Sequence, residues 1–181
     1  MKVSRADIDG LLIVETRAFA DDRGFFEESW NARDFAEATG VETTFVQDNR
    51  SRSTLGVLRG FHYQLPNPQG KLVRCSSGLI WDVAVDIRRS SPTFKRWFGL
   101  ELSGDDHLQL WVPEGFAHGF VVLSPTADVL YKASAYFDSA SDKGFRWDDP
   151  DIGVQWPVTS DLIISEKDLA APAFADAVLF E

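Results

Sequence analysis

Histidine side chains are the first candidates for chemistry, because the chain contains only His62, His107 and His118. His62 and His118 lie in short runs that alternate in polarity, and a glycine near each lets another group approach closely. A single strand histidine is usually a satisfied core residue, but the presence of two in separate strands makes a functional role for them more competitive with that interpretation. His107 follows a Ser-Gly-Asp-Asp turn and is predicted to face solvent.

The elements that would position these histidines have a period of two, which is typical of β-strands. In residues 81–88, Trp81 and Val85 share one predicted face while Asp82 and Asp86 share the other. Similar runs occupy residues 44–47, 57–64, 71–75, 97–102, 109–112, 117–123 and 129–137. Helical patterns are confined to residues 31–39, which precede Gly40, and to a C-terminal tail at 166–177. The sequence predicts an all-β sandwich or barrel in a single domain spanning residues 1–181.

Composition narrows the possible partners. The chain is 44% hydrophobic and carries a formal net charge of −10, which opposes a broad nucleic-acid surface. No apolar run is long enough to span a membrane, and the N-terminus lacks the pattern of a signal peptide. The one cysteine, Cys75, cannot form an internal disulfide. We therefore expect a cytoplasmic protein that binds neither nucleic acid nor membranes.

The segments around the two strand histidines resemble the paired motifs of the cupin jelly roll. Gly56 followed by His62 is similar to the start of the first motif, and residues 113–118, Pro-Glu-Gly-Phe-Ala-His, match the second. Metal-binding cupins carry His-x-His and then a glutamate, whereas this chain reads His62-Tyr63-Gln64 with no acidic residue before Asp82. The set is a poor transition-metal site. We therefore expect a cupin-like double-sheet jelly roll with no metal.

A longer series of motifs resembles the dTDP-4-dehydrorhamnose 3,5-epimerase family. The matching segments occur in order at residues 22–28, 46–49, 58–64, 69–74, 81–88, 113–120 and 130–132. The resemblance covers roughly residues 10–170. It implies an isomerase that acts without a cofactor on dTDP-4-dehydro-6-deoxy-D-glucose and inverts C3 and C5, which the 4-keto group acidifies, on the route to dTDP-L-rhamnose.

The resemblance assigns four catalytic side chains. His62 is the expected base, and its reference pKa of about 6.5 suits proton abstraction near neutral pH. Asp168 is expected to orient His62, although a carboxylate at the start of a helix is otherwise often solvated. Tyr131 is the expected proton donor on the opposite face of the sugar. Lys71 is expected to stabilise the enolate oxygen.

The resemblance also implies a set of substrate contacts and a second histidine–aspartate pair. His118 is an expected substrate contact, oriented by Asp82. Arginine and lysine side chains in the set suit a diphosphate, which an arginine can bind in a bidentate manner. The other expected contacts are Arg23, Glu28, Gln47, Asn49, Arg59, Asp142 and Lys167.

The alternation of side chains along a β-strand conflicts with placing two of these residues in one site. Arg59 and His62 are three positions apart, so a regular strand would point them to opposite faces. Either a bulge near Gly60 realigns them, or one of them serves a neighbouring subunit. The family is dimeric, which favours the second explanation and predicts a homodimer.

One departure leaves other functions open. The chain reads Tyr136-Phe137 where the family would carry a pair of tyrosines. The missing hydroxyl could change the balance between inversion at C3 and C5, so a mono-epimerase at one carbon is an alternative. A metal-dependent oxygenase or a non-catalytic sugar-binding cupin is a further alternative from another class.

Overall fold

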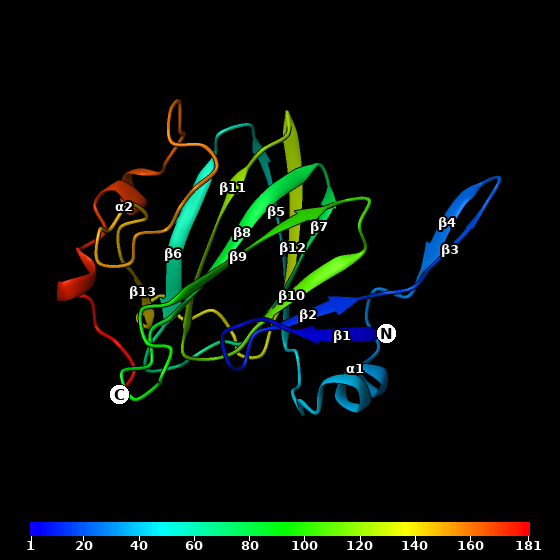
Figure 1. Cartoon of the computed structure of the whole chain (residues 1–181), viewed down its shortest axis with the longest axis horizontal. Helices are drawn as coiled ribbons and strands as arrows, with labels where there is room; N and C mark the ends of the chain where they lie inside the picture. Colours follow the sequence, from blue (N-terminus) through cyan, green and yellow to red (C-terminus); the bar gives the residue numbers. More distant parts are fainter.

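Two antiparallel β-sheets lie face to face in the computed structural model, which describes residues 1–181 (Figure 1). The larger sheet has six strands in the order β1-β2-β10-β7-β12-β5. Its strands are β1 (Lys2–Arg5), β2 (Leu12–Glu15), β10 (Leu108–Val112), β7 (Lys71–Ser77), β12 (Thr126–Ala133) and β5 (Gln47–Thr54). The non-sequential order means that the chain crosses repeatedly between the sheets, as a jelly roll requires.

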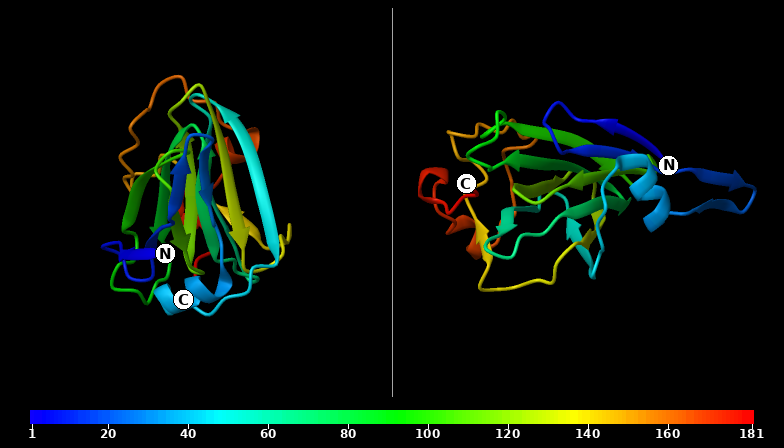
Figure 2. Two further views of the ribbon diagram at one scale, coloured as in Figure 1. Left: turned by 90° about the vertical axis from the view of Figure 1, so that its right-hand side faces the viewer. Right: turned by 90° about the horizontal axis from the view of Figure 1, so that it is seen from below.

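The smaller sheet has five strands in the order β13-β6-β11-β8-β9. Its strands are β13 (Asp142–Gly144), β6 (Leu58–Gln64), β11 (Phe116–Val122), β8 (Leu79–Asp86) and β9 (Trp97–Ser103). Figure 2 shows the two sheets from two further directions. The prediction of an all-β, double-sheet fold with few short helices is confirmed. No helix is long and apolar enough to cross a membrane.

The main core fills the space between the sheets. Val73 and Val129 from the six-stranded sheet pack in one buried cluster with Ile80, Phe116 and Phe120 from the five-stranded sheet. Alternation along these strands places Asp82 and His118 on the same inner faces as their apolar neighbours. The inner surface of the sandwich therefore carries polar side chains beyond the apolar core.

The C-terminal tail covers the outer face of the five-stranded sheet. Phe61 and Tyr63 of β6 pack there with Phe145, Trp156 and Phe174 in a second buried cluster. The tail contains a single turn of α-helix, α2 (Glu166–Leu169), and a 3₁₀ turn, η1 (Phe174–Asp176). The predicted helical tail at 166–177 is thus two short turns with an extended break between them.

Helix α1 (Ala32–Thr39) confirms the predicted helix and its limits. The Asn31 side chain accepts hydrogen bonds from the backbone of Arg33 and Asp34, and Gly40 ends the helix at φ 73°. Phe35 is buried against Trp111 on the outer face of the six-stranded sheet. This helix therefore covers part of that face.

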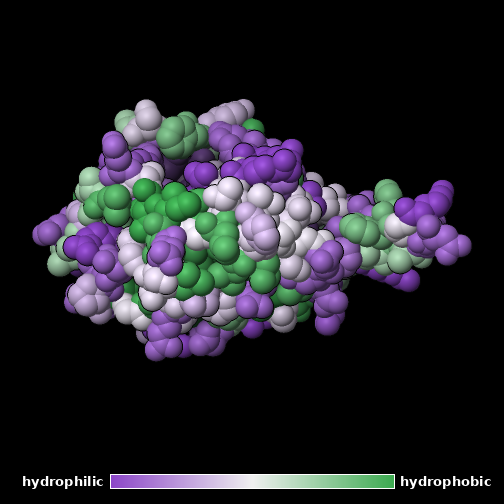
Figure 3. Space-filling model, turned by 90° about the horizontal axis from the view of Figure 1, so that it is seen from above, coloured by the Kyte–Doolittle hydropathy of each residue, from purple (hydrophilic) through white to green (hydrophobic).

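A two-stranded hairpin projects from the body of the molecule (Figures 1 and 3). It consists of β3 (Ala18–Asp21) and β4 (Gly24–Glu27), which pair only with each other. At its base, the Nδ1 atom of His107 lies 3.3 Å from the Glu27 carboxylate, and its ring packs edge-on against Phe25. The prediction that His107 faces solvent is wrong, because a distant segment covers it.

Several strands differ from the sequence prediction. Strand β5 begins at Gln47, so the predicted strand 44–47 falls almost entirely before it. Its residues are polar on both faces, and it lies at a sheet edge, so no hydrophobic alternation marks it. Strand β12 ends at Ala133, four residues before the predicted end. The strands before Arg33 and the short strand β13 were also absent from the prediction.

Candidate active site

A β-bulge in β6 aligns Arg59 and His62. His118 pairs with His62 and Phe120 pairs with Arg59, so three steps along β6 oppose two steps along β11. Leu58 and Phe61 pack under the C-terminal tail, which leaves Arg59 and His62 on the inner face. The Arg59 Nε atom lies 3.2 Å from Ser53 Oγ on the facing sheet. The bulge thus lets Arg59 and His62 face the same site within one chain, and a neighbouring subunit is not needed to explain their spacing.

His62 and Asp168 form a hydrogen-bonded pair. The His62 Nε2 atom lies 2.6 Å from Asp168 Oδ1. Asp168 is buried, and its second oxygen accepts from the Gly60 backbone N–H at 3.4 Å. Burial opposes ionisation of Asp168, but the bonds from His62, Gly60 and Ser165 outweigh it and lower its pKa. Asp168 is therefore an ionised hydrogen-bond acceptor that fixes the orientation of the imidazole.

A second pair, His118 and Asp82, lies on the neighbouring strands of the same sheet. His118 Nε2 is 2.8 Å from Asp82 Oδ1, and both side chains are buried. Because β11 runs between β6 and β8, His118 lies beside both His62 and Asp82. The second oxygen of Asp82 has no hydrogen-bond partner although it is buried. The predicted second dyad is present as a geometric pair.

Lys71 and Tyr131 face these pairs from the six-stranded sheet. The Lys71 ammonium lies 5.9 Å from the centre of the Tyr131 ring. Burial lowers the pKa of Lys71 to about 8, against the opposing attraction of the Asp142 and Asp82 carboxylates. Burial also raises the pKa of Tyr131, so its phenol stays protonated at neutral pH. An ammonium group and a protonated phenol therefore lie opposite His62. We call the inner region that holds His62, His118, Lys71 and Tyr131 the cup.

Two further predicted contacts line the cup from edge strand β5. Asn49 is the direct cross-strand partner of Tyr131, and Gln47 is the partner of Ala133. The Gln47 amide donates to Asn49 Oδ1 at 2.9 Å, and its oxygen accepts from the Phe137 backbone at 2.9 Å. Gln47 thus also holds the chain that follows β12.

Asp142 and Lys167 lie at the edge of the same region and form an ion pair. Asp142 belongs to β13, and its partner belongs to α2, next to Asp168. These two predicted contacts are therefore joined to each other in the absence of substrate.

Arg23 and Glu28 are not brought into the cup of their own chain. Arg23 lies in the turn of the projecting hairpin, where its guanidinium pairs with Asp21. Glu28 follows the hairpin and accepts a hydrogen bond from Asn31. The structure thus separates the predicted contacts into a cup group and a hairpin group.

Sequence reasoning missed the role of Gln64. Its buried amide donates to the carbonyls of Asn67 and Tyr136, at 2.8 and 3.3 Å, and accepts from the Asp138 backbone at 2.8 Å. It therefore ties the segment around Tyr136 and Phe137 to the strand that carries His62. Its place two residues after His62, on the same strand face, was the available signal.

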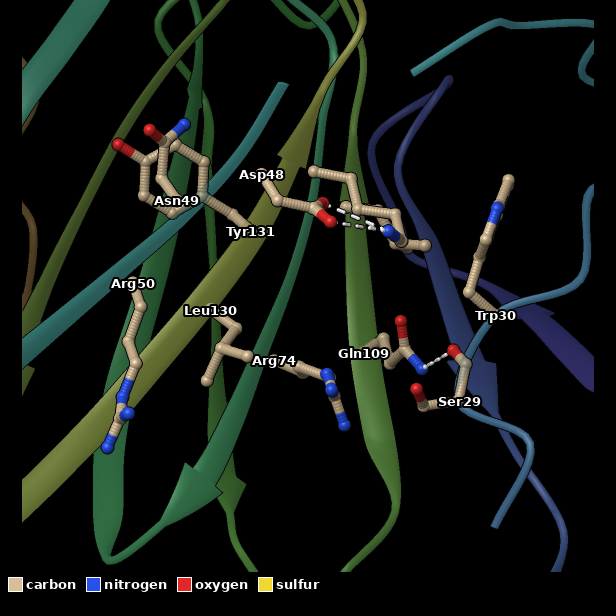
Figure 4. Close-up of a pocket in the computed structure, with 11 residues that line it drawn as sticks. Ser29, Trp30, Asp48, Asn49, Arg50, Arg74, Gln109, Leu130 and Tyr131 are labelled. Carbon is tan, nitrogen blue, oxygen red and sulfur yellow. Dashed lines mark hydrogen bonds and ion pairs between the residues drawn. The ribbon is translucent and has the colours of Figure 1, made fainter. Parts of the chain in front are cut away.

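A separate depression of about 230 Å³ opens on the outer face of the six-stranded sheet (Figure 4). Among its charged residues, Lys132 donates to Asp48 and Arg50 pairs with the buried Asp128, whereas Arg74 has no ion pair. Tyr131 and Asn49 are cross-strand partners that extend away from these groups in Figure 4. The depression and the cup therefore lie on opposite faces of the sheet.

No three His, Cys, Asp or Glu side chains gather into a group that could hold a metal ion. The chemical groups of the cup are two histidine–carboxylate pairs, a lysine and a tyrosine. Together these groups can remove a proton, stabilise negative charge on oxygen and return a proton.

Comparisons with known proteins agree with this chemistry. The family model described as dTDP-4-dehydrorhamnose 3,5-epimerase matches residues 5–176. An enzyme of that name from Shigella flexneri is 51% identical over 181 residues, covering 99% of each chain. The Legionella pneumophila enzyme, solved with dTDP-4-keto-L-rhamnose, superimposes with a TM-score of 0.93 at 46% identity, covering 95% of this chain and 92% of that one. A 3'-monoepimerase from Streptomyces bikiniensis, solved with dTDP-quinovose, has a TM-score of 0.87 at 31% identity over 94% and 86% of the two chains.

The jelly roll and the polar cup between its sheets define a cupin-like enzyme of the sugar-epimerase class. The chain belongs to the dTDP-4-dehydrorhamnose 3,5-epimerase family. The family resemblance seen in the sequence motifs is confirmed.

Proposed function

We propose that this protein converts dTDP-4-dehydro-6-deoxy-D-glucose to dTDP-4-dehydro-L-rhamnose by inverting C3 and C5 of the sugar. The observation that carries the proposal is the His62–Asp168 pair facing Lys71 and Tyr131 inside one cup. The full-length similarity to enzymes of that name supports the choice of substrate.

Each inversion proceeds through an enolate. His62 takes the proton from the carbon next to the ketone; the electron pair of that C–H bond forms a C=C bond to C4, and the π pair of the C=O bond moves onto the 4-keto oxygen. Lys71 stabilises the developing negative charge, an interaction stronger in the transition state than with the neutral ketone. Tyr131 then donates its proton to the opposite face of the carbon, and exchange with solvent removes the proton from His62 and returns one to Tyr131 before the next inversion. Asp168 holds His62 in place throughout. These reaction steps need no cofactor.

The test is uptake of solvent deuterium into dTDP-4-dehydro-6-deoxy-D-glucose. We expect label at both C3 and C5 with the unmodified protein, and a loss of about 10² to 10⁴ in rate with His62→Ala. Unchanged exchange in His62→Ala would overturn the assignment of the base. No exchange with the unmodified protein would overturn the function.

Inversion at a single carbon is a second candidate. Phe137 lies in the segment that Gln47 and Gln64 hold beside the cup, and it lacks the hydroxyl expected there. The Streptomyces bikiniensis relative is named as a 3'-monoepimerase. Label at C3 alone, or at C5 alone, in the same assay would favour this candidate.

A homodimer is the proposed assembly, with residues 1–181 as a single domain. Phe19, Phe25 and Phe26 of the projecting hairpin are 52%, 58% and 70% exposed, which is unusual for so many aromatic rings in one small element. A second copy of the chain would cover them. Arg23 and Glu28 would then contact substrate in the partner's cup, and we propose the diphosphate as the group that Arg23 binds.

A further inference from the structure

Helix α2 and strand β13 flank the proposed base. Strand β13 pairs directly with β6, so that Gly144 lies opposite His62 and Asp142 lies opposite Gln64. Helix α2 contacts the same strand through Asp168, which binds His62 at 2.6 Å. Two elements from distant parts of the chain therefore meet at His62.

The ion pair between Asp142 and Lys167 joins these two elements to each other. The Asp142 side chain is 18% exposed and the Lys167 side chain is 62% exposed, so the pair is partly screened from solvent on one side. The contacts close a ring that runs from His62 to Asp168, along α2 to Lys167, across to Asp142, and back through β13. A displacement of α2 must therefore break or stretch one of these contacts.

The four residues of helix α2 make few other contacts, although the chain on either side is anchored: Ile163 exchanges backbone hydrogen bonds with Gly56 and Leu58, and Pro172 accepts one from Arg146. It is a single turn of four residues, too short to be stable by itself. Leu169, its one large apolar side chain, is 63% exposed and adds little packing. The Ser165 side chain caps the turn but belongs to the same segment. Between the anchors at Ile163 and Pro172, the position of Asp168 thus depends on the polar contacts of α2 with the sheet.

We propose that Asp142 and Lys167 are positioning residues, whose ion pair holds α2 against β13 and so keeps Asp168 on His62. The inference rests on the proposed function, in which His62 is the base. It assigns the pair a task in the free protein, before any contact that either side chain makes with substrate.

A double-mutant cycle tests the coupling, and it is measured well below the Lys71 pKa of about 8, where loss of the Asp142 charge leaves Lys71 protonated. We expect Asp142→Asn and Lys167→Met each to lower kcat for deuterium uptake by about fivefold, within the range of coupled pairs. The double variant should be no slower than the slower single variant. Asp142→Glu and Lys167→Arg should restore kcat. Comparison of kcat is required, because Lys167→Met also removes a proposed diphosphate contact and should raise KM.

Two neighbours provide matched controls. Lys143→Met removes a lysine whose ammonium donates to the Ala140 carbonyl, and Glu166→Gln removes an exposed carboxylate from α2 itself. Both should retain the unmodified kcat. If the effects of Asp142→Asn and Lys167→Met multiply in the double variant, Asp142 acts through another group, such as Lys71, and the proposal is wrong.

Amide hydrogen exchange measures the stability of α2 directly and needs no substrate. In the free protein, backbone exchange of residues 165–170 should speed up several-fold in Asp142→Asn and Lys167→Met but not in the controls. Unchanged exchange in both variants would refute the positioning role, whatever the activity. If α2 loosens as expected while the unmodified protein shows no deuterium uptake, the proposed function fails but the role of the Asp142–Lys167 ion pair in holding α2 stands.

Discussion

The protonation state of Lys71 decides whether the proposed site carries a positive charge. Burial of its ammonium lowers the pKa to about 8, while the carboxylates of Asp142 and Asp82 oppose that shift. Lys71 is therefore protonated below about pH 8 and loses its charge as the pH rises through that value. Tyr131 loses its proton only at higher pH, because burial raises its pKa above the ordinary value. The two groups should titrate in that order.

The first prediction is an alkaline fall in rate caused by Lys71. Deuterium uptake should decrease above about pH 8, approaching tenfold per pH unit, because only the ammonium stabilises the enolate. Asp142→Asn should move this fall to lower pH, because it removes a charge that raises the pKa of Lys71. Lys71→Met should be slow throughout, and Lys143→Met should keep the unmodified profile. A profile of the unmodified protein that stays flat from pH 7 to 9.5 would contradict the role.

A second residue-scale prediction concerns Asp168. Asp168→Asn keeps the shape of the side chain but removes the negative charge that orients the imidazole. We expect deuterium uptake to fall by about 10² or more. Near-UV circular dichroism would verify that the fold is retained. An unchanged rate in a folded variant would remove Asp168 from the mechanism.

The bulge in β6 decides the site at the scale of elements. It turns Arg59 and His62 to the same face, although they are three residues apart. Gly60 lies in the bulge at φ 117°, and a Cβ atom there would lie 2.7 Å from both Gly119 Cα and the His118 carbonyl. Only glycine fits this close approach between the two histidine-bearing strands.

Gly60→Ala should therefore be strongly destabilising. We expect a loss of about 2 kcal/mol or more, which corresponds to a decrease in Tm of roughly 4–8 °C. Gly24→Ala is the matched control, because Gly24 has a similar φ of 125° but nothing within 4 Å of an added Cβ. Differential scanning calorimetry of both variants would separate backbone strain from the clash. Equal decreases in Tm would indicate that close packing at Gly60 is unimportant.

At the scale of the whole molecule, the projecting hairpin is the feature that bears on association between chains. Its strands pair with no other strand and extend away from the sandwich (Figure 1). Its aromatic rings are exposed in a single chain. A β-hairpin of this size is marginally stable by itself. Its base is held by the contacts of His107 with Phe25 and Glu27. An association partner would supply the remaining stability.

Phe26→Ser should weaken the proposed homodimer. Phe26 is 70% exposed, so its replacement should leave the fold of one chain intact but raise the dimer dissociation constant by roughly tenfold or more. Leu55→Ser is a control, because Leu55 is 54% exposed in the turn between β5 and β6. Sedimentation velocity over a dilution series would measure both. A monomeric unmodified protein at all concentrations would refute the assembly.

Local patterns predicted a large part of this molecule. The alternation around Trp81 and Val85 predicted strand β8, and the pattern of residues 31–39 followed by Gly40 predicted helix α1. These features depend on neighbours in sequence, which is why they can be read from it. Motif order also determined the family, and through it the candidate groups His62, Lys71, Tyr131 and Asp168.

Only the tertiary structure decided how those groups meet. The bulge at Gly60 depends on the register between β6 and β11, and the polar strand β5 is recognisable only by its pairing with β12. The contact of His107 with Glu27 and the ion pair of Asp142 with Lys167 join segments far apart in the chain. Residue types therefore determined the available chemistry, whereas register and long-range packing, which no local pattern encodes, determined which side chains share the cup.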